Sequence, residues 1–414
     1  MYQLIATFLT FLFIPVLLRF KVRLSHTIAI TAIMLALLSG IGINQILSIF
    51  TGVFLDPLSL DTILTVFMVS LVGGTMKHYG LLDRVVSAIL QVIRSRKTVL
   101  MVIPSLIGML TIPGGAVLSA PFVDDIGKDV GLIPPQRAAV NLIFRHIAML
   151  VFPFSMVVLF VRSAMPGINI YVIIFYNLVF MVLLLTFAYF RYLRKVQEPS
   201  SEKNSLPGHL SRYLKDLAIY TSPIYVPVTL NAALGIPFSV AMLFSMLIIF
   251  YLSDREEFAW VLKKSAGWDT VLMIVSVLMI KDIILQMNSM LEVFDLVFNA
   301  AGSHLSLIGV FIATSVFFGF ITGNMNAPLA ITLPMLTRLS SSNGMNISQL
   351  HVFTYFLMIS AFLGYYFSPL HLCQTFTLKV MKVTTGELYK TYGAYIFIAL
   401  GLLVISTMTL LALA

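Results

Sequence analysis

The chain has 414 residues, of which 59% are hydrophobic and only 10% are charged, and its mean hydropathy is +0.99. A soluble core of this length does not need so much apolar sequence, whereas repeated apolar runs of about 20 residues are typical of helices that cross a bilayer. The formal net charge is +9. The basic residues behind it are distributed among the loops in a pattern that indicates membrane orientation and not nucleic-acid binding.

Apolar runs follow one another along the whole sequence, and the first one lacks the basic start and small-residue cleavage motif of a signal peptide. We therefore expect a retained first span and an all-α polytopic membrane protein. The expected spans are 3–18, 26–47, 58–76, 98–112, 138–161, 168–190, 214–234, 237–252, 269–287, 305–321, 349–367 and 391–413. Two interrupted pieces, 113–134 and 322–345, are expected to turn back without crossing the membrane.

Lys and Arg are unevenly distributed among the loops, and basic loops face the cytoplasm. With the N-terminus placed outside, the basic residues of 19–23, 94–97 and the polar linker 191–215 all become cytoplasmic. The outer loops then keep little more than Arg162 and Arg338. We therefore expect a multi-pass inner-membrane protein with both termini outside and the linker in the cytoplasm.

The two halves of the chain share an order of features. In each half an amphipathic segment, 82–93 or 291–298, precedes a span, a break and a further span that is broken in its middle. The breaks lie at Pro113-Gly114-Gly115 and Thr322–Pro328, and then at Leu150–Ser155 and Tyr365–His371. Only the first amphipathic segment is basic, so we expect two inverted repeats.

Paired interrupted segments in inverted halves indicate the binding site of a transporter. Broken backbone is tolerated in a membrane where it lines a cavity enclosed by protein. Each hairpin tip would expose the N-terminus of a half-helix, whose free N–H groups and partial positive charge favour an anion.

The stretches "PGGAVLSAP" (113–121) and "NLIFRHIAMLVFPF" (141–154) resemble a prokaryotic permease family of the ion-transporter superfamily, which contains citrate and dicarboxylate symporters and gluconate permeases. The resemblance covers roughly residues 58–390. It implies a scaffold domain that is often dimeric and a transport domain with two re-entrant hairpins that moves as an elevator. It also implies that substrate and coupling ion bind at the hairpin tips and helix breaks.

On this basis we divide the chain into scaffold and repeat segments. They are N-terminal scaffold helices (1–57), a first inverted repeat (58–190) with a re-entrant hairpin at 98–134, the cytoplasmic linker (191–215), scaffold helices of the second half (216–268), a second inverted repeat (269–390) with a re-entrant hairpin at 305–345, and a C-terminal transmembrane helix (391–414).

The first tip offers Gly114, Gly115 and Ser119 as candidate ligand-binding residues. Glycines let the backbone approach a ligand, although the same residues also suit a tight turn packed against protein. Dicarboxylate symporters carry Ser-Asn-Thr at their tips, and the first tip of this chain lacks the Asn-Thr pair.

The second tip offers Thr322, Gly323, Asn324 and Asn326, followed by Pro328 in the first turn of a helix. Asn326 could cap that helix, bind a ligand, or do both. Candidate residues for a sodium ion are Gly114, Ser119, Thr322, Asn324 and Asn326, but no metal site is assigned.

Arg145 lies inside an apolar span, where an arginine costs about 2.5–3.5 kcal/mol on insertion scales and usually faces a cavity or a partner. It could bind a substrate carboxylate, pair with Asp124, Asp125 or Asp129, or extend to the cytoplasmic face. Asn141 shares its helical face, and His146 follows it directly.

Ser368 and His371 lie in the second helix break, and His146 and His371 could carry protons or be satisfied core residues. Lys281 and Asp282 are adjacent in another span. Adjacent helical residues do not face each other, so we do not expect them to form an ion pair.

No nucleotide-binding, metalloprotease or serine-hydrolase motif is present. The sequence therefore predicts no enzyme and no cofactor, but a secondary active transporter for a small organic anion of the carboxylate class, coupled to sodium or protons. Expected partners are this substrate, the lipid bilayer and a second copy in a homodimer, with no nucleic acid. A cation/proton antiporter or channel on the same scaffold is the main alternative, and a membrane-embedded enzyme is a more distant one.

Overall fold

The computed structural model describes residues 2–109, 116–197, 210–288, 292 and 304–414, and every regular element within them is helical. Among these residues, seven helical segments are long and apolar enough to cross a membrane. The predicted class, an all-α protein embedded in the membrane, is confirmed.

The helices, in chain order, are α1 (Tyr2–Arg19), α2 (Leu24–Leu38), α3 (Ile43–Leu55), α4 (Pro57–His78), α5 (Leu81–Val92), α6 (Arg96–Met109), α7 (Ala116–Asp129), α8 (Pro134–Val151), α9 (Met156–Ala164), α10 (Ile170–Ala188), the π-helical turn η1 (Tyr189–Leu193), α11 (Leu210–Leu234), α12 (Phe238–Leu252), α13 (Phe258–Ser265), α14 (Trp268–Leu285), α16 (His304–Thr322), α17 (Asn326–Asn343), α18 (Ile347–Tyr366), α19 (Leu372–Met381), α20 (Thr385–Tyr392) and α21 (Tyr395–Leu413).

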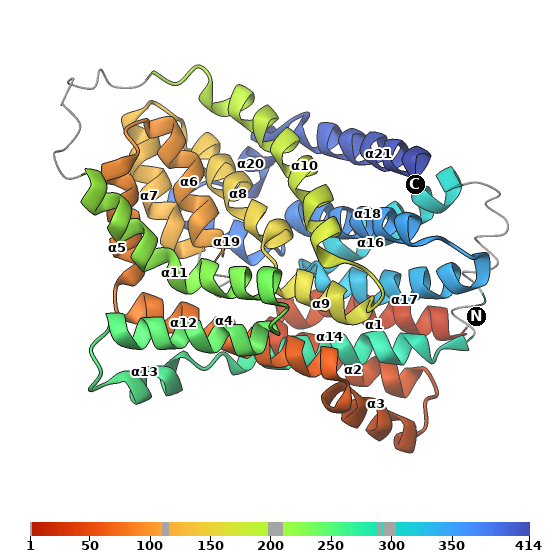
Figure 1. Ribbon diagram of the computed structural model, residues 1–414. Helices are drawn as coiled ribbons and strands as arrows, with labels where there is room; N and C mark the ends of the chain where they lie inside the picture. Colours follow the sequence, from red (N-terminus) through yellow and green to blue (C-terminus); the bar gives the residue numbers. More distant parts are fainter. Residues whose placement is uncertain (1, 110–115, 198–209, 289–291, 293–303) are drawn as a thin grey trace.

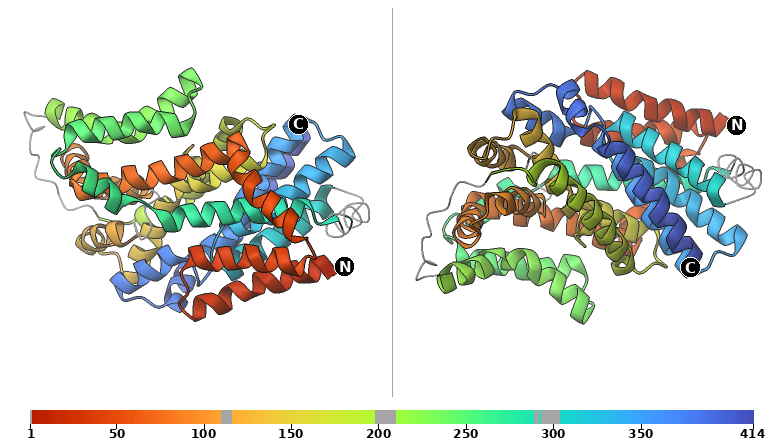
Figure 2. Two further views of the ribbon diagram at one scale, coloured as in Figure 1. Left: turned by 90° about the horizontal axis from the view of Figure 1, so that it is seen from below. Right: turned by 90° about the horizontal axis from the view of Figure 1, so that it is seen from above.

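Most helices run across the page in Figure 1, and both ends of the chain lie at the right side of the bundle. Helices α5, α6 and α7 lie at the left side, and the two further views agree (Figure 2). Helices α6 and α7 pack against each other, as do α16 and α17 toward the right. These two helix pairs therefore enter the bundle from opposite ends.

Two helical segments of the bundle are interrupted. Residues 152–155 separate α8 from α9, and residues 367–371 separate α18 from α19. Pro153 and Pro369 lie in these segments. Proline lacks an N–H group and clashes with the preceding turn, which explains why neither helix continues.

The single span expected at 26–47 is wrong, because the chain turns between α2 and α3. Gly40 has φ +72°, a left-handed conformation that glycine adopts without the steric penalty of a Cβ atom. Most residues of α3 are exposed, and only Ile49 and Val53 are buried. Helix α3 is therefore a separate helix at the edge of the bundle.

Helix α5 has the amphipathic character predicted for this segment. Leu82, Val85 and Ile89 are buried, whereas Asp83 and Arg84 are exposed. The corresponding segment of the second half, 291–298, lies outside the described residues except for residue 292.

Polar contacts join α9 to the helices beside it. Nη1 of Arg162 on α9 donates to Oδ2 of Asp61 on α4 over 2.7 Å. Oδ1 of Asp61 accepts from the hydroxyl of Ser239 on α12 over 2.5 Å, and the hydroxyls of Ser59 and Ser163 lie 3.0 Å apart. Asp61 thus connects three helices.

Lys281 and Asp282 of α14 do form an ion pair, with Nζ 2.8 Å from Oδ1. The expectation that adjacent residues would not pair is wrong here. Their Cβ atoms diverge around the helix, but the flexible four-carbon lysine stem lets the ammonium group reach back to the neighbouring carboxylate.

Candidate functional site

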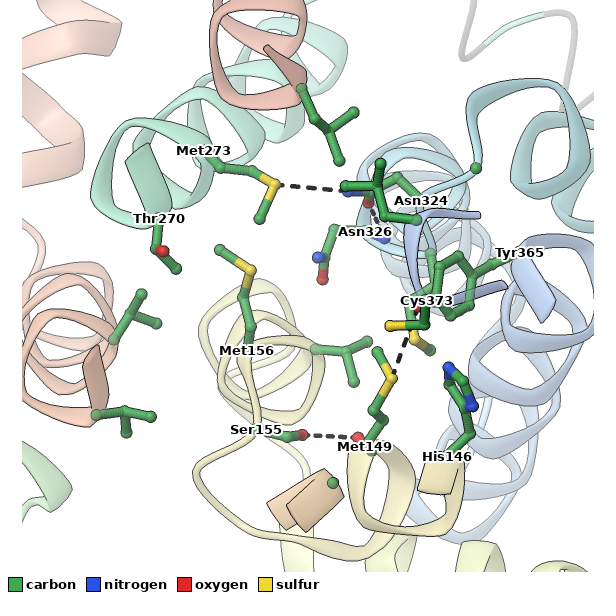
Figure 3. A pocket seen from close by; sticks show the side chains of 18 of the residues that line it. His146, Met149, Ser155, Met156, Thr270, Met273, Asn324, Asn326, Tyr365 and Cys373 are labelled. Atoms are coloured by element: carbon green, nitrogen blue, oxygen red, sulfur yellow. Dashed lines mark hydrogen bonds between the residues drawn. The ribbon is translucent and has the colours of Figure 1, made fainter. Parts of the chain in front are cut away.

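A cavity of about 220 Å³ lies between two groups of helices, and we call it the central cavity. Helices α4 and α14 form the wall at the left of Figure 3. The α8–α9 segment forms the lower wall, and the start of α17 with the α18–α19 segment forms the right wall. Both helix breaks therefore adjoin the central cavity.

The buried guanidinium of Arg145, on α8, lines the central cavity. Its side chain is 5% exposed, and its Nη1 donates to the hydroxyl of Ser119 on α7 over 3.4 Å. A Cβ atom at Gly108 of α6 would lie 2.2 Å from the carbonyl oxygen of Arg145. Helices α6, α7 and α8 thus meet around this one residue.

No carboxylate within the described parts of the chain forms an ion pair with Arg145. Asp124 accepts instead from Nε of Arg137 over 2.8 Å and also pairs with Lys128. Asp125 lies 3.7 Å from the ammonium of Lys128. A buried cation without a carboxylate partner is costly, and an anion bound in the central cavity would lower that cost.

The turn between α16 and α17 is built by its own side chains. Oδ1 of Asn324 accepts from the N–H groups of Asn326 over 2.7 Å and Ala327 over 3.3 Å. The Thr322 hydroxyl accepts from the N–H of Asn324 over 3.3 Å. Asn324 thus caps α17, a role that the sequence analysis considered for Asn326.

The side chain of Asn326 is free to bind a ligand. It is 5% exposed, its Oδ1 has no hydrogen-bond partner among the described residues, and its amide points into the central cavity in Figure 3. A buried polar group left unpaired costs about 1–3 kcal/mol. A ligand group that donates a hydrogen bond to this oxygen would remove that cost.

The same turn packs against the break between α18 and α19. A Cβ atom at Gly323, where φ is +60°, would lie 2.8 Å from the carbonyl carbon of Leu370. The hydroxyl of Ser368 donates to the carbonyl of Phe320 over 2.5 Å and accepts from the N–H of Leu370 over 3.1 Å. The turn and the break therefore support each other.

Two buried histidines meet beside Arg145. The Nε2 atoms of His146 and His371 lie 3.0 Å apart. Nδ1 of His146 lies 2.6 Å from the carbonyl oxygen of Leu142, and Nδ1 of His371 lies 3.4 Å from that of Tyr366. His146 lines the central cavity, and His371 lies behind it.

The ligand atoms of His146, His371 and Cys373 lie within 4.8 Å of one another. Ligand atoms around one tetrahedral zinc ion lie about 3.3–3.6 Å apart, as its bond lengths and angles require. These three side chains would have to converge before they could hold such an ion, and we assign no metal site to them.

Most of the remaining wall is apolar or contains sulfur. Met149, Met156 and Met273 line the central cavity together with Phe154 and Cys373. Methionine side chains adapt to irregular shapes and offer polarizable surface. The arrangement suits a small ligand with one anionic end and an apolar body.

The structure brings five of the predicted site residues to the wall of the central cavity: Arg145, His146, Gly323, Asn324 and Asn326.

Five other predicted site residues lie behind this wall. Ser119 contacts Arg145 and His371 contacts His146, while Asn141 donates to the hydroxyl of Thr377 on α19 over 2.9 Å. Thr322 and Ser368 shape the turn and the break, as described above. The predicted residues Gly114 and Gly115 lie outside the described residues.

Several residues of the wall were not expected from the sequence. Tyr365 was not among the predicted site residues, but it lines the central cavity, and its ring centroid lies 4.1 Å from that of His371. Thr270, Met273 and Ser70 come from α14 and α4. Ser70 and Met273 lie within apolar runs that give no local signal, whereas Cys373 lies two residues after the predicted His371, which could have pointed to it.

Comparison with known proteins adds one finding. The sequence matches the family described as "Protein of unknown function (DUF401)" over residues 3–412. The chain belongs to this family. No curated protein matches the chain. The family description gives no substrate, and the central cavity is the feature of this DUF401 member that bears on its ligand.

Proposed function

We propose that the protein is a secondary active transporter for a small organic anion and that the anion binds in the central cavity. The observation that carries the proposal is the Arg145 guanidinium, which is buried on the cavity wall with no carboxylate partner in the described parts of the chain. A guanidinium presents a planar fork of donors that matches a carboxylate. The amide of Asn326, on the facing helix, supplies a second polar contact.

The size and lining of the central cavity narrow the class of substrate. Its volume of about 220 Å³ is below the roughly 300–1,000 Å³ of pockets for drug-sized ligands. Its wall of methionine, phenylalanine and valine side chains favours an organic body over a fully hydrated inorganic ion. A small carboxylate meets both conditions.

The arrangement of helices supports transport in preference to catalysis or cation conduction. Helix pairs enter from opposite ends, and both helix breaks adjoin the cavity. Paired interrupted segments of this kind characterise transporter binding sites. Acidic residues inside spans usually mark cation paths, but the Asp282 carboxylate in α14 is paired with Lys281 and does not line the cavity.

The transport mechanism that we propose has three parts. We infer two inverted repeats, an elevator-like movement of the hairpin-bearing helices against a scaffold, and a homodimer, as the resemblance to the ion-transporter superfamily implies. We also infer that both termini face outward. The coupling ion is sodium or a proton.

The test is the thermal stability of the purified full-length protein with acetate, pyruvate, succinate, citrate and inorganic phosphate as probes, each with and without sodium. A bound anion stabilises the folded state by RT ln(1 + [L]/Kd), about 2.7 kcal/mol at a hundredfold excess over Kd. We expect a carboxylate to raise the melting temperature and phosphate to have little effect.

Variants show whether Arg145 carries the binding. We expect Arg145→Gln to abolish the shift and Arg145→Lys to weaken it, since lysine keeps the charge but not the fork of donors. Arg94→Gln is the matched control because Arg94 is exposed and lies away from the cavity. An anion-induced shift that persists in Arg145→Gln would contradict the proposal.

A further inference from the structure

The paired histidines beside the central cavity have an unusual hydrogen-bonding requirement. Four ring nitrogens take part in three close contacts, one between His146 and His371 and one from each ring to a backbone carbonyl. A carbonyl oxygen can only accept a hydrogen bond, so each Nδ1 must donate to its own carbonyl. Both Nε2 atoms are then left facing each other at 3.0 Å.

Counting protons shows what this geometry needs. Two neutral imidazoles carry two protons, which the two contacts to the carbonyls of Leu142 and Tyr366 use up. The Nε2 atoms would then meet lone pair to lone pair. A third proton, bonded to one Nε2 and accepted by the other, completes all three hydrogen bonds and gives the pair a single positive charge.

The groups that face the pair offer no negative charge. They are Arg145 on α8, the phenols of Tyr365 and Tyr366 on α18, the thiol of Cys373 on α19, and Tyr392 of α20, whose hydroxyl donates to that of Tyr366 over 3.0 Å.

The carboxylates on the helices packed around the pair are engaged elsewhere. On α7, Asp124 and Asp125 pair with basic side chains, and Asp129 is exposed. On α20, Glu387 bonds to Thr384 at the helix start. Within the described residues, the charge nearest to the histidine pair is therefore the cation of Arg145.

We propose that His146 and His371 together hold the coupling proton, and that this proton and the substrate anion bind in concert. This inference depends on the proposed function, because the anion provides the missing negative charge. A guanidinium and a protonated pair would repel each other in the empty buried site. An anion bound to Arg145 offsets that repulsion and so lowers the free energy of adding the third proton.

Thermodynamic linkage makes this coupling reciprocal. If an anion favours protonation of the pair, protonation must favour the anion by the same factor. The apparent affinity for the anion should then fall by about tenfold per unit rise in pH, over the range where one linked proton is lost. The protein would be a proton–anion symporter.

The test is 15N nuclear magnetic resonance of the full-length protein in proteoliposomes, labelled at histidine, from mildly acidic to mildly alkaline pH. Spectra are recorded without an anion, and then with pyruvate or succinate. We expect two histidine signals that share one proton and change together with pH. Either anion that binds should move their midpoint to higher pH by about one unit or more.

Variants assign the signals. His371→Gln and His146→Gln should each abolish the shared-proton signals and reduce the pH dependence of anion-induced stabilisation from about tenfold to less than about twofold per pH unit. His78→Gln is the matched control, since His78 lies at the end of α4 and does not line the cavity. It should behave like the unmodified protein.

Three results would overturn the inference. The first is a pair that shares no proton at any pH, and the second is a shared proton that a bound anion does not affect. The third is a pair whose Nε2 signals respond to added zinc chloride and not to pH, which would make it a metal site. None of these removes anion binding, whereas failure of every anion in the thermal test would contradict the proposed function itself.

Discussion

Gly108 brings helix α6 against the backbone of α8 at the residue that carries the cavity's guanidinium. The atom closest to a Cβ at this position would be the carbonyl oxygen of Arg145, followed by its carbonyl carbon at 3.2 Å. Backbone atoms inside a helix cannot rotate away as a flexible side chain can. The missing side chain therefore fixes how closely α6 supports Arg145.

We predict that Gly108→Ala separates α6 from α8 and destabilises the protein by about 1–3 kcal/mol, the range for overpacked interiors. Thermal unfolding in detergent measures this loss. Gly52→Ala in α3 is the control, because nothing lies within 4 Å of a Cβ there and alanine favours a helix. Equal melting temperatures for the two variants would contradict the predicted close packing.

At the scale of single elements, α20 begins with a reciprocal capping box between Thr384 and Glu387. The Thr384 hydroxyl accepts from the N–H of Glu387 over 3.3 Å, and the Glu387 carboxylate accepts from the N–H of Thr384 over 2.8 Å. These bonds from the backbone and the hydroxyl of Thr384 hold the pKa of the Glu387 carboxyl below its ordinary value. The ionised carboxylate is thus the form that stabilises α20.

The pH dependence of this cap follows from the direction of the pKa shift. Its stabilisation is complete above the pKa of the unfolded chain and is lost as pH falls through the lower pKa of the folded state. We expect Glu387→Gln to remove this part of the acid-side loss, measured by hydrogen exchange of α20 amides against pH. Glu256→Gln, at an exposed site, should leave the pH profile unchanged, and an unchanged profile in Glu387→Gln would contradict the prediction.

Helix breaks and isolated polar residues of the site could be predicted from the sequence, whereas the apolar residues of the cavity wall could not. Helix breaks were predictable where proline interrupts an apolar run, as at Pro153 and Pro369, and Arg145 and Asn326 stood out as polar residues among apolar ones. Met149 and Met273 could not be singled out, since a methionine in a membrane helix has the same local pattern whether it faces lipid or a cavity.

The pairing of side chains was less predictable than their positions. That Asp124 pairs with Arg137 and leaves Arg145 without a carboxylate partner among the described residues depends on how α7 packs on α8. The approach of His371 to His146 joins residues 225 positions apart in the chain. Neither follows from periodicity or composition, because both are set by tertiary packing.

At the scale of the whole molecule, the central cavity lies where helices of both halves of the chain meet. Cys373, the only cysteine of the sequence, lines this cavity and is partly exposed. The native thiol is therefore a built-in reporter of access to the site, and no cysteine has to be introduced.

We predict that a membrane-impermeant thiol reagent modifies Cys373 from either side of sealed vesicles, because an alternating-access site opens to each side in turn. A bound carboxylate should slow the modification several-fold by covering the thiol, as measured by mass spectrometry. Cys373→Ser should show no labelling. Modification from one side only, under every condition, would argue against alternating access.

The contact between Asp61 on α4 and Arg162 on α9 has a consequence for speed. If α9 moves past α4 during each cycle, this ion pair and the neighbouring Ser59–Ser163 contact must open and close once per turnover. These contacts would then hold α9 against α4, and stronger contacts would lengthen the lifetime of the state in which they are formed. The side chains of Arg162 and Asp61 are 26% and 11% exposed, so the ion pair is largely enclosed by protein, and opening it would cost more than opening a pair on the surface.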